Sequence, residues 1–280
     1  MSHAPIGDVL EGSERALRPP DAGPTRRGTV GTKPATLRPD AWWLQPMATG
    51  VVLLAFVAYA TWVAFQGKHY FAPPAYLSPF YSPCLASGCG VHTNLAIFGK
   101  WYTWSPALII LIFPLGFRLT CYYYRKTYYR TFWFSPPACA VAEPHGRYSG
   151  ETRFPLILQN VHRYFFYFAF LFAAILTWDA VDAFHWPQGW GHAGLGTLML
   201  VVNAGLIWGY TLSCHTCRHL CGGKLNRFSS ARVRYRLWRA VSRLNANHAK
   251  WAWASLVWIA LTDAYIRMVA VGWISDPKFF

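Results

Sequence analysis

Five long apolar stretches constrain this chain more than any other feature of its sequence. They lie at residues 47–65, 95–117, 161–178, 194–212 and 251–271. About twenty consecutive apolar residues are needed to cross the hydrocarbon core of a bilayer as a helix. The second stretch contains Pro106 and Pro114, which membrane helices tolerate where neighbours satisfy the freed carbonyl groups. The sequence therefore predicts an all-α polytopic membrane protein, a bundle of five transmembrane helices.

The charged residues predict an orientation for these five helices. Only 13% of the 280 residues are charged, about half the share in an average soluble domain. Of the 26 Lys and Arg residues, 22 lie in the N-terminal tail, in residues 118–163 and in residues 213–250, all on one side. Short loops rich in Lys and Arg stay in the cytoplasm. We therefore expect a cytoplasmic N-terminus, and the net charge of +15 needs no nucleic acid to explain it.

Two regions of different composition divide the chain. Residues 1–40 lack a continuous apolar run and carry scattered Arg, Pro and Gly, which is typical of a flexible cytoplasmic tail rather than a cleavable signal peptide. Residues 41–280 hold all five apolar stretches, and we expect them to form the membrane domain. The 15 Trp residues suit such a domain, because amphipathic aromatic side chains favour the membrane–water interface.

The seven cysteines divide between the two sides of the membrane. Cys84 and Cys89 lie in the first outer loop, where an oxidising compartment allows a disulfide between them. Two unpaired thiols are the alternative. The other five cysteines fall on the cytoplasmic side, together with five histidines.

Candidate metal ligands gather at the cytoplasmic ends of four helices. Eight side chains qualify, and four of them are expected to bind: Cys121, Cys139, His162, Cys214, His215, Cys217, His219 and His248. Cys214 and Cys217 rank first among the thiols, and His162 and His248 are the imidazoles that come from separate helices. A single Cys in an apolar helix is more often a small hydrophobic side chain. The convergence at one membrane depth favours a metal or iron–sulfur site.

The residue types narrow the kind of centre. Zinc accepts Cys and His ligands. A b-type haem would need two facing histidines, and the apolar middles of the five stretches contain none. A Rieske-type [2Fe–2S] cluster, with two Cys on one iron and two His on the other, uses the residues available. This cluster is the hypothesis that the sequence favours, although the usual Rieske loop motifs are absent.

Long runs of the sequence resemble one known family. The similarity is to the membrane-anchor (cytochrome b-like) subunit of actinobacterial succinate dehydrogenases and fumarate reductases, complex II. It is carried by FRLTCYYYRKTYYRTFWFSPPACAV (residues 117–141), RYSGETRFPLILQNVHRYFFY (residues 147–167) and YTLSCHTCRHLCGG (residues 210–223). The likeness also takes in NANHAKWAWASL and the DPKFF ending, so that only the N-terminal tail lies outside it.

The resemblance implies a role and a set of partners. Such an anchor docks a soluble flavoprotein and an iron–sulfur subunit on the cytoplasmic face of the inner (plasma) membrane, among the membrane lipids. It passes succinate-derived electrons to menaquinone or ubiquinone as the non-dehydrogenase subunit of the enzyme. A higher oligomer of the complex is left open. Other five-helix anchors hold two b haems between paired histidines, and this sequence lacks the mid-membrane pairs, which favours the iron–sulfur centre.

A quinone needs an apolar slot with hydrogen-bond donors near its carbonyl oxygens. On the inner side the candidate residues are His162, Arg163, Tyr164 and Trp251. On the outer side, Asp263 and Arg267 lie four residues apart in the fifth stretch. Ionisable groups inside a span are a functional hypothesis by default, so these two could exchange protons with an outer quinone site. A structural ion pair between them is the alternative. We favour the inner site.

A function of a different class stays open at this point. The chain could be a transporter, or a structural membrane anchor, with a zinc-stabilised cytoplasmic face. Transporters often show inverted repeats with broken helices, and the two halves of this sequence show no convincing repeat.

Overall fold

The computed structural model describes residues 38–84, 104–142, 144, 154–223, 225–227 and 229–279, with residues 154–159 described by their backbone alone. Most of the expected N-terminal tail and Cys89 lie outside these residues. The described part of the chain is almost entirely helical. Its paired strands are confined to two short antiparallel hairpins.

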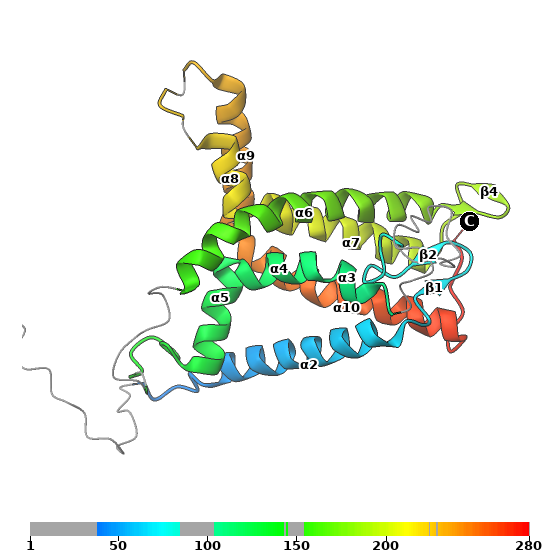
Figure 1. Cartoon of the computed structure of the whole chain (residues 1–280), viewed down its shortest axis with the longest axis horizontal. Coiled ribbons are helices and arrows are strands. Elements are labelled where there is room, and N and C mark those ends of the chain that lie inside the picture. Colours follow the sequence, from blue (N-terminus) through cyan, green and yellow to red (C-terminus); the bar gives the residue numbers. More distant parts are fainter. Residues whose placement is uncertain are drawn as a thin grey trace, which may run out of the picture.

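Four long helices form the body of the molecule. They are α2 (Leu44–Gln66), α6 (Phe154–Asp182), α7 (Leu195–Leu212) and α10 (His248–Val271), and each is long and apolar enough to cross a membrane. They run roughly parallel in Figure 1. The helices α2 and α10 end at Gly67 and Gly272, whose φ angles of 60° and 81° are the left-handed conformation that glycine adopts most readily.

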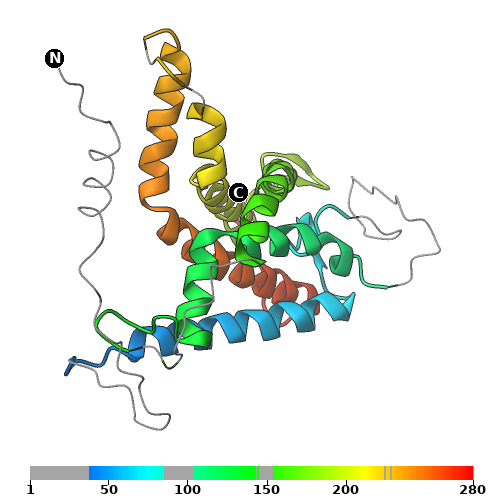
Figure 2. The same cartoon turned by 60° about the vertical axis from the view of Figure 1, so that its left-hand side comes forward.

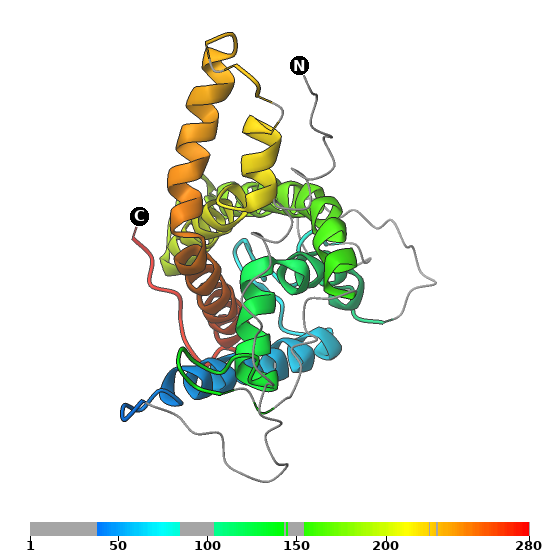
Figure 3. The same ribbon diagram turned by 90° about the vertical axis from the view of Figure 1, so that its left-hand side faces the viewer.

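The remaining apolar segment is broken into short helices. It consists of α3 (Ala107–Ile110), α4 (Ile112–Thr120), α5 (Tyr122–Tyr128) and the π-helix η2 (Tyr129–Trp133). The break between α3 and α4 follows from Pro114, which has no N–H to bond the Ile110 carbonyl. At Cys121 the chain turns by 75°, so that α5 leaves the bundle direction. Figure 3 shows α5 reaching from α4 toward α2.

The two ends of the bundle differ. At one end α8 (His215–Gly222) and α9 (Arg232–Ala246) project together as a helical hairpin, which Figure 2 shows standing away from the spans. At the other end lie β1 (Phe71–Ala72) paired with β2 (Tyr76–Leu77), and β3 (His185–Trp186) paired with β4 (Gly189–Trp190). We call these the hairpin end, where α8 and α9 project, and the strand end.

Two glycines allow close packing between membrane-spanning helices. A Cβ on Gly116 of α4 would lie 2.2 Å from the Phe165 ring of α6, and one on Gly209 of α7 would lie 2.5 Å from the Trp251 ring of α10. Small residues at such contacts let membrane helices approach closely and gain dispersion energy. Other faces of the spans carry exposed apolar side chains, such as Leu54 on α2, which suit contact with lipid.

The predicted all-α polytopic fold is confirmed, and the spans match the five apolar stretches when the bent segment is counted as one. The observed helices extend beyond several predicted bounds, since α2 begins at Leu44, α6 at Phe154 and α10 at His248. The second span continues to Thr120 rather than to residue 117, and its predicted part at residues 95–103 lies outside the described residues.

Candidate metal centre

Two thiols and two imidazoles lie together at the hairpin end of the bundle, three of them at helix ends. His162 was expected at a helix end but lies inside α6, because α6 begins at Phe154. The Nε2 atom of His162, in α6, lies 3.1 Å from the Sγ atom of Cys214, at the junction of α7 and α8. The Nε2 atom of His248, the first residue of α10, lies 3.4 Å from the Sγ atom of Cys121, at the junction of α4 and α5. We call these four residues the Cys/His cluster.

Hydroxyl groups determine which nitrogen of each imidazole carries the proton. Thr120 donates its hydroxyl hydrogen to the Gly116 carbonyl at 2.7 Å, so its oxygen accepts from Nδ1–H of His162 at 2.8 Å. Ser213 donates to the Tyr210 carbonyl at 2.9 Å and accepts from Nδ1–H of His248 at 2.7 Å in the same way. Both Nε2 atoms therefore keep a free lone pair, which they direct toward a thiol.

The two cysteines occupy matching backbone positions. Each is the N-cap of a short helix that follows a membrane span, Cys121 before α5 and Cys214 before α8, with φ of −64° at both. The Thr216 amide donates to the Cys214 sulfur at 3.4 Å. Burial, and after it the neighbouring Cys121 thiol, raise the pKa of Cys214 to about 12. A metal that binds this sulfur would therefore have to displace a proton.

Aromatic rings cover the imidazoles. The Phe117 ring stacks on His162 with 4.8 Å between centroids, and the Tyr210 ring stacks on His248 with 5.2 Å between centroids. The Arg118 guanidinium lies 4.7 Å from the centroid of the Tyr210 ring. Cys121, His162 and Cys214 are buried, His248 is partly exposed, and one positive charge lies close by.

The other candidate ligands lie elsewhere. Cys139 is exposed, and its carbonyl accepts a hydrogen bond from Arg38. The imidazoles of His215 and His219 are exposed on α8, where His219 contacts Arg163. Cys217 faces Cys221 on the same helix, and burial together with this neighbour raises the pKa of Cys217 to about 12. The structure therefore brings Cys214 close to Cys121, although the sequence ranked Cys217 above Cys121 as a ligand.

The inner quinone candidates do not share one surface. His162 is buried within the Cys/His cluster, whereas Arg163 is exposed and Tyr164 is 68% exposed on the opposite side of α6. Trp251 packs under Gly209, with its indole nitrogen buried and unpaired among the described residues. These four side chains therefore do not line one slot.

The donor types of the Cys/His cluster are those that a two-iron cluster uses, while the described side chains are not arranged as a site for a metal ion. Among the described residues, no group of three or more His, Cys, Asp or Glu side chains is placed to hold one metal ion. The cluster instead offers two thiols and two imidazoles, the ligands that a Rieske [2Fe–2S] centre divides between its two irons. The hydroxyl on each Nδ1 is the kind of outer partner that orients a metal-binding imidazole.

A buried ion pair lies near the strand end. The Asp263 carboxylate accepts hydrogen bonds from Arg267 at 2.8 Å, from Tyr59 at 2.5 Å and from Ser78. Arg267 also donates to the Gln66 side chain at 2.8 Å. Of the two cysteines expected in the first outer loop, Cys84 is buried and disulfide-bonded, while its expected partner Cys89 lies outside the described residues.

Comparison with known proteins identifies the family. Residues 44–272 match the family described as actinobacterial succinate dehydrogenase subunit SdhC. This chain belongs to that family. A chain of the Mycobacterium smegmatis Sdh1 complex in the apo form is 49% identical, with a TM-score of 0.81, over 92% of this chain and 97% of that one. Comparison with curated proteins finds no match.

Membership of the SdhC family confirms the resemblance seen in the sequence and replaces the transporter alternative. The chain is a multi-pass membrane subunit of succinate dehydrogenase and works with the other subunits of that enzyme. Sequence reasoning missed Thr120, Ser213 and Arg118. A signal for the hydroxyls exists, because each directly precedes a cysteine in the chain, in Thr120-Cys121 and Ser213-Cys214.

Proposed function

We propose that this SdhC subunit passes electrons from the soluble subunits to a quinone through a Rieske-type [2Fe–2S] centre held by Cys121, His162, Cys214 and His248. The observation that supports this proposal is that two helix junctions, the start of α10 and a residue inside α6 bring two thiols and two imidazoles together, with each Nε2 facing a thiol. Haem is less well supported, because each Nε2 faces a thiol rather than the other imidazole.

The overall reaction balances through the complex. Succinate gives fumarate, two electrons and two protons at the soluble subunits, and a menaquinone or ubiquinone takes up two electrons and two protons to become quinol. A His-ligated [2Fe–2S] centre supplies one-electron transfer at a raised reduction potential. The residues of this chain position the donors: Thr120 and Ser213 orient the imidazoles, while Phe117 and Tyr210 stack on their faces. The subunit itself oxidises no succinate.

The hairpin end is the proposed docking face for the flavoprotein and iron–sulfur subunits, on the cytoplasmic side of the plasma membrane. The helix α9 carries five arginines and exposes Val233 at 71% and Leu237 at 52%, although it lies outside the spans. Large exposed apolar groups on such a surface are typical of a protein contact. The residue 1–40 tail belongs to this side in the same proposal, next to a membrane domain of residues 41–280.

Replacement of the two imidazoles tests the centre. In the purified complex, His162→Ala and His248→Ala should each abolish quinone reduction and remove a low-average-g EPR signal, because each removes an iron ligand. Succinate oxidation with an artificial dye should continue, since it needs only the soluble subunits. His215→Ala, which changes an exposed imidazole on α8, is the matched control and should keep the signal.

Metal analysis of the wild-type complex adds an independent readout. Iron and acid-labile sulfide should exceed the content of the soluble subunits by two atoms of each per complex, as a [2Fe–2S] centre requires. The proposal is wrong if both histidine variants keep quinone reduction and the EPR signal. A haem absorption band or stoichiometric zinc in place of the additional iron would also overturn it.

A further inference from the structure

The helix α9 carries an apolar stripe that contacts the rest of the protein only at one end. Val233, Leu237 and Val241 follow one another at spacings of four residues, so they lie along one side of the helix. Val241 is 8% exposed and belongs to a core cluster that includes Ala252 of α10. Leu237 is 52% exposed and Val233 is 71% exposed. The stripe therefore begins against the bundle at Val241 and becomes exposed toward the start of α9.

The α8–α9 hairpin leaves the bundle at the level where the spans end. Only Asn247 separates α9 from α10, and only Ser213 and Cys214 separate α7 from α8. In Figure 1, α8 and α9 stand across the direction of the four long helices. Figure 3, which looks along the bundle from the hairpin end, shows them extending beyond the spans. Since the long helices cross the membrane, α8 and α9 lie along its surface.

Contacts with α8 and with the bundle fix the direction in which the stripe faces. Arg234 of α9 donates to the Cys221 carbonyl at 3.2 Å and to the Gly223 carbonyl at 3.1 Å, both at the end of α8. These bonds and the packing of Val241 hold α9 against rotation about its own axis. Because Val241 faces the bundle, the rest of the stripe faces the same way. Beyond the edge of the bundle, that is the side on which the bilayer lies.

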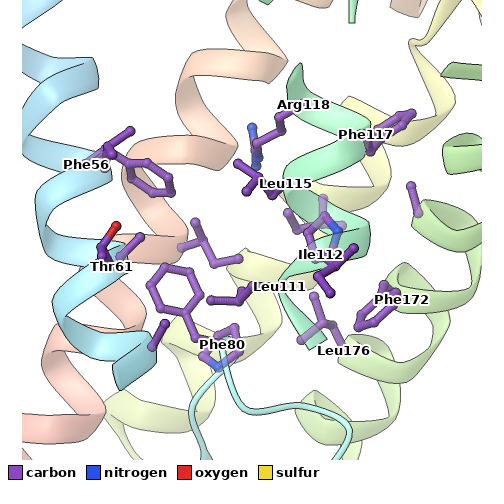
Figure 4. Close-up of a pocket in the computed structure, with 18 of the residues that line it drawn as sticks. Phe56, Thr61, Phe80, Leu111, Ile112, Leu115, Phe117, Arg118, Phe172 and Leu176 are labelled. Atoms are coloured by element: carbon purple, nitrogen blue, oxygen red, sulfur yellow. The ribbon is translucent and has the colours of Figure 1, made fainter. Parts of the chain in front are cut away.

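A second face of α9 is strongly basic. Its four arginine side chains are exposed and recur at helical spacing: Arg232, Arg236, Arg239 and Arg243. No carboxylate of the described residues pairs with them. Arg118 differs, because it lies inside the α4 span (Figure 4) and donates hydrogen bonds to the Tyr124 hydroxyl at 2.7 Å and to the Ser255 hydroxyl at 3.1 Å. The arginines of α9 are therefore suited to a negatively charged partner outside this chain.

We propose that the apolar stripe of α9 lies in the inner leaflet of the membrane and that the arginines beside it attract anionic phospholipids. A helix with one apolar and one basic face typically lies in the plane of the membrane interface. Long arginine side chains keep their guanidinium groups in the polar layer while the helix body contacts acyl chains. Basic side chains at this level attract anionic head groups.

The position of the stripe favours lipid over a soluble subunit. An exposed apolar surface marks either a protein contact or a membrane contact. A soluble subunit cannot reach the stripe from the side that the bilayer occupies. The inference rests on the proposed orientation and narrows the docking proposal: α9 offers the flavoprotein and iron–sulfur subunits its cytoplasmic side, while the stripe of Val233 and Leu237 belongs to the membrane.

Photo-cross-linking in the full complex tests the inference. The photoreactive residue benzoylphenylalanine is placed at Leu237 or Val233, and the complex is embedded in liposomes of phosphatidylglycerol and phosphatidylcholine in equal parts. On illumination, both positions should form at least about tenfold more phospholipid adduct than Arg239, measured by mass spectrometry. Arg239 is the matched control, because it is exposed and lies two residues from Leu237, nearly on the opposite side of the helix. Most adducts should contain phosphatidylglycerol, the anionic lipid.

The outcomes separate this inference from the docking proposal. Adducts of Leu237 and Val233 with a soluble subunit would overturn it, because the stripe would then be a protein contact. Lipid adducts no more frequent than at Arg239 would overturn it as well, and equal amounts of the two phospholipids would contradict the role of the arginines. Docking on α9 predicts a soluble-subunit adduct at Arg239. If that adduct is missing while Leu237 labels lipid, docking on α9 is wrong and the membrane contact stands.

Discussion

At the scale of single residues, two hydroxyl groups orient the imidazoles of the Cys/His cluster. Thr120 holds His162, whose Nε2 meets Cys214, while Ser213 holds His248, whose Nε2 meets Cys121. Each hydroxyl–cysteine dipeptide therefore orients one imidazole with its hydroxyl and meets the other with its thiol. The two dipeptides, Thr120-Cys121 and Ser213-Cys214, are therefore linked through both imidazoles.

Removal of one hydroxyl should weaken the centre without removing a ligand. In Thr120→Val, the His162 Nδ1–H loses its acceptor, so we expect about a 10–100-fold loss of metal affinity or quinone reduction. The reduction potential, measured by EPR-monitored titration, should also change. Thr127→Val removes a comparable hydroxyl, which donates to the Tyr123 carbonyl at 2.9 Å, and should change neither. Unaltered potential and iron content in Thr120→Val would show that the hydroxyl has no such role.

The sequence predicted which residue types form the site better than it predicted which of these residues lie next to one another. The sequence identified the eight candidates because soft and imidazole side chains gather at helix ends. It ranked Cys217 with Cys214, since the two are three residues apart. The turn at Cys121 instead brings the α4–α5 junction next to Cys214, and a bend of that kind leaves no mark in hydropathy. The ligand roles themselves stay a proposal.

At the scale of helices, α7 and α10 approach closely at one glycine. Gly209 faces the Trp251 ring, while Gly205, one turn earlier in α7, has no atom within 4 Å of an added Cβ. Gly209→Ala should therefore destabilise the complex by about 1–3 kcal/mol through overpacking. Gly205→Ala should be neutral or slightly stabilising, because alanine loses less conformational freedom in a helix than glycine.

Thermal unfolding of the detergent-solubilised complex, followed by loss of quinone reduction and by tryptophan fluorescence, measures the effect of these two changes. A lower midpoint for Gly209→Ala alone agrees with the observed packing. Equal midpoints for both variants would mean that α7 and α10 are not in close contact at Gly209. Sequence alone located both helices from their apolar length, but it could not reveal which of the two glycines faces the neighbouring helix.

At the scale of the whole molecule, the two ends of the bundle should lie in different compartments. Ser230→Cys introduces a thiol in the exposed connection between α8 and α9, and Gln188→Cys introduces one between β3 and β4. The distribution of Lys and Arg predicts that the first lies in the cytoplasm and the second outside. A membrane-impermeant maleimide should label Gln188→Cys in intact cells and Ser230→Cys only in inverted vesicles.

The opposite labelling pattern would contradict the proposed orientation. Both changes are made in a Cys139→Ser chain, because the exposed Cys139 would otherwise react with the maleimide as well.

The fold as a whole was predictable because long apolar runs leave few alternatives to membrane helices. The projecting α8–α9 hairpin and the bent α5 were not, because the sequence does not reveal in which direction a helix outside the spans leaves the bundle.

The helix α2 is fastened near both of its ends. Toward the strand end, Tyr59 and Gln66 bond the buried Asp263 and Arg267 pair. At the other end, Gly50 lies so close to η2 that a Cβ would meet Thr131 at 2.9 Å. Because α2 is held at both ends, it cannot tilt away from the bundle unless the contacts at one of these ends are broken.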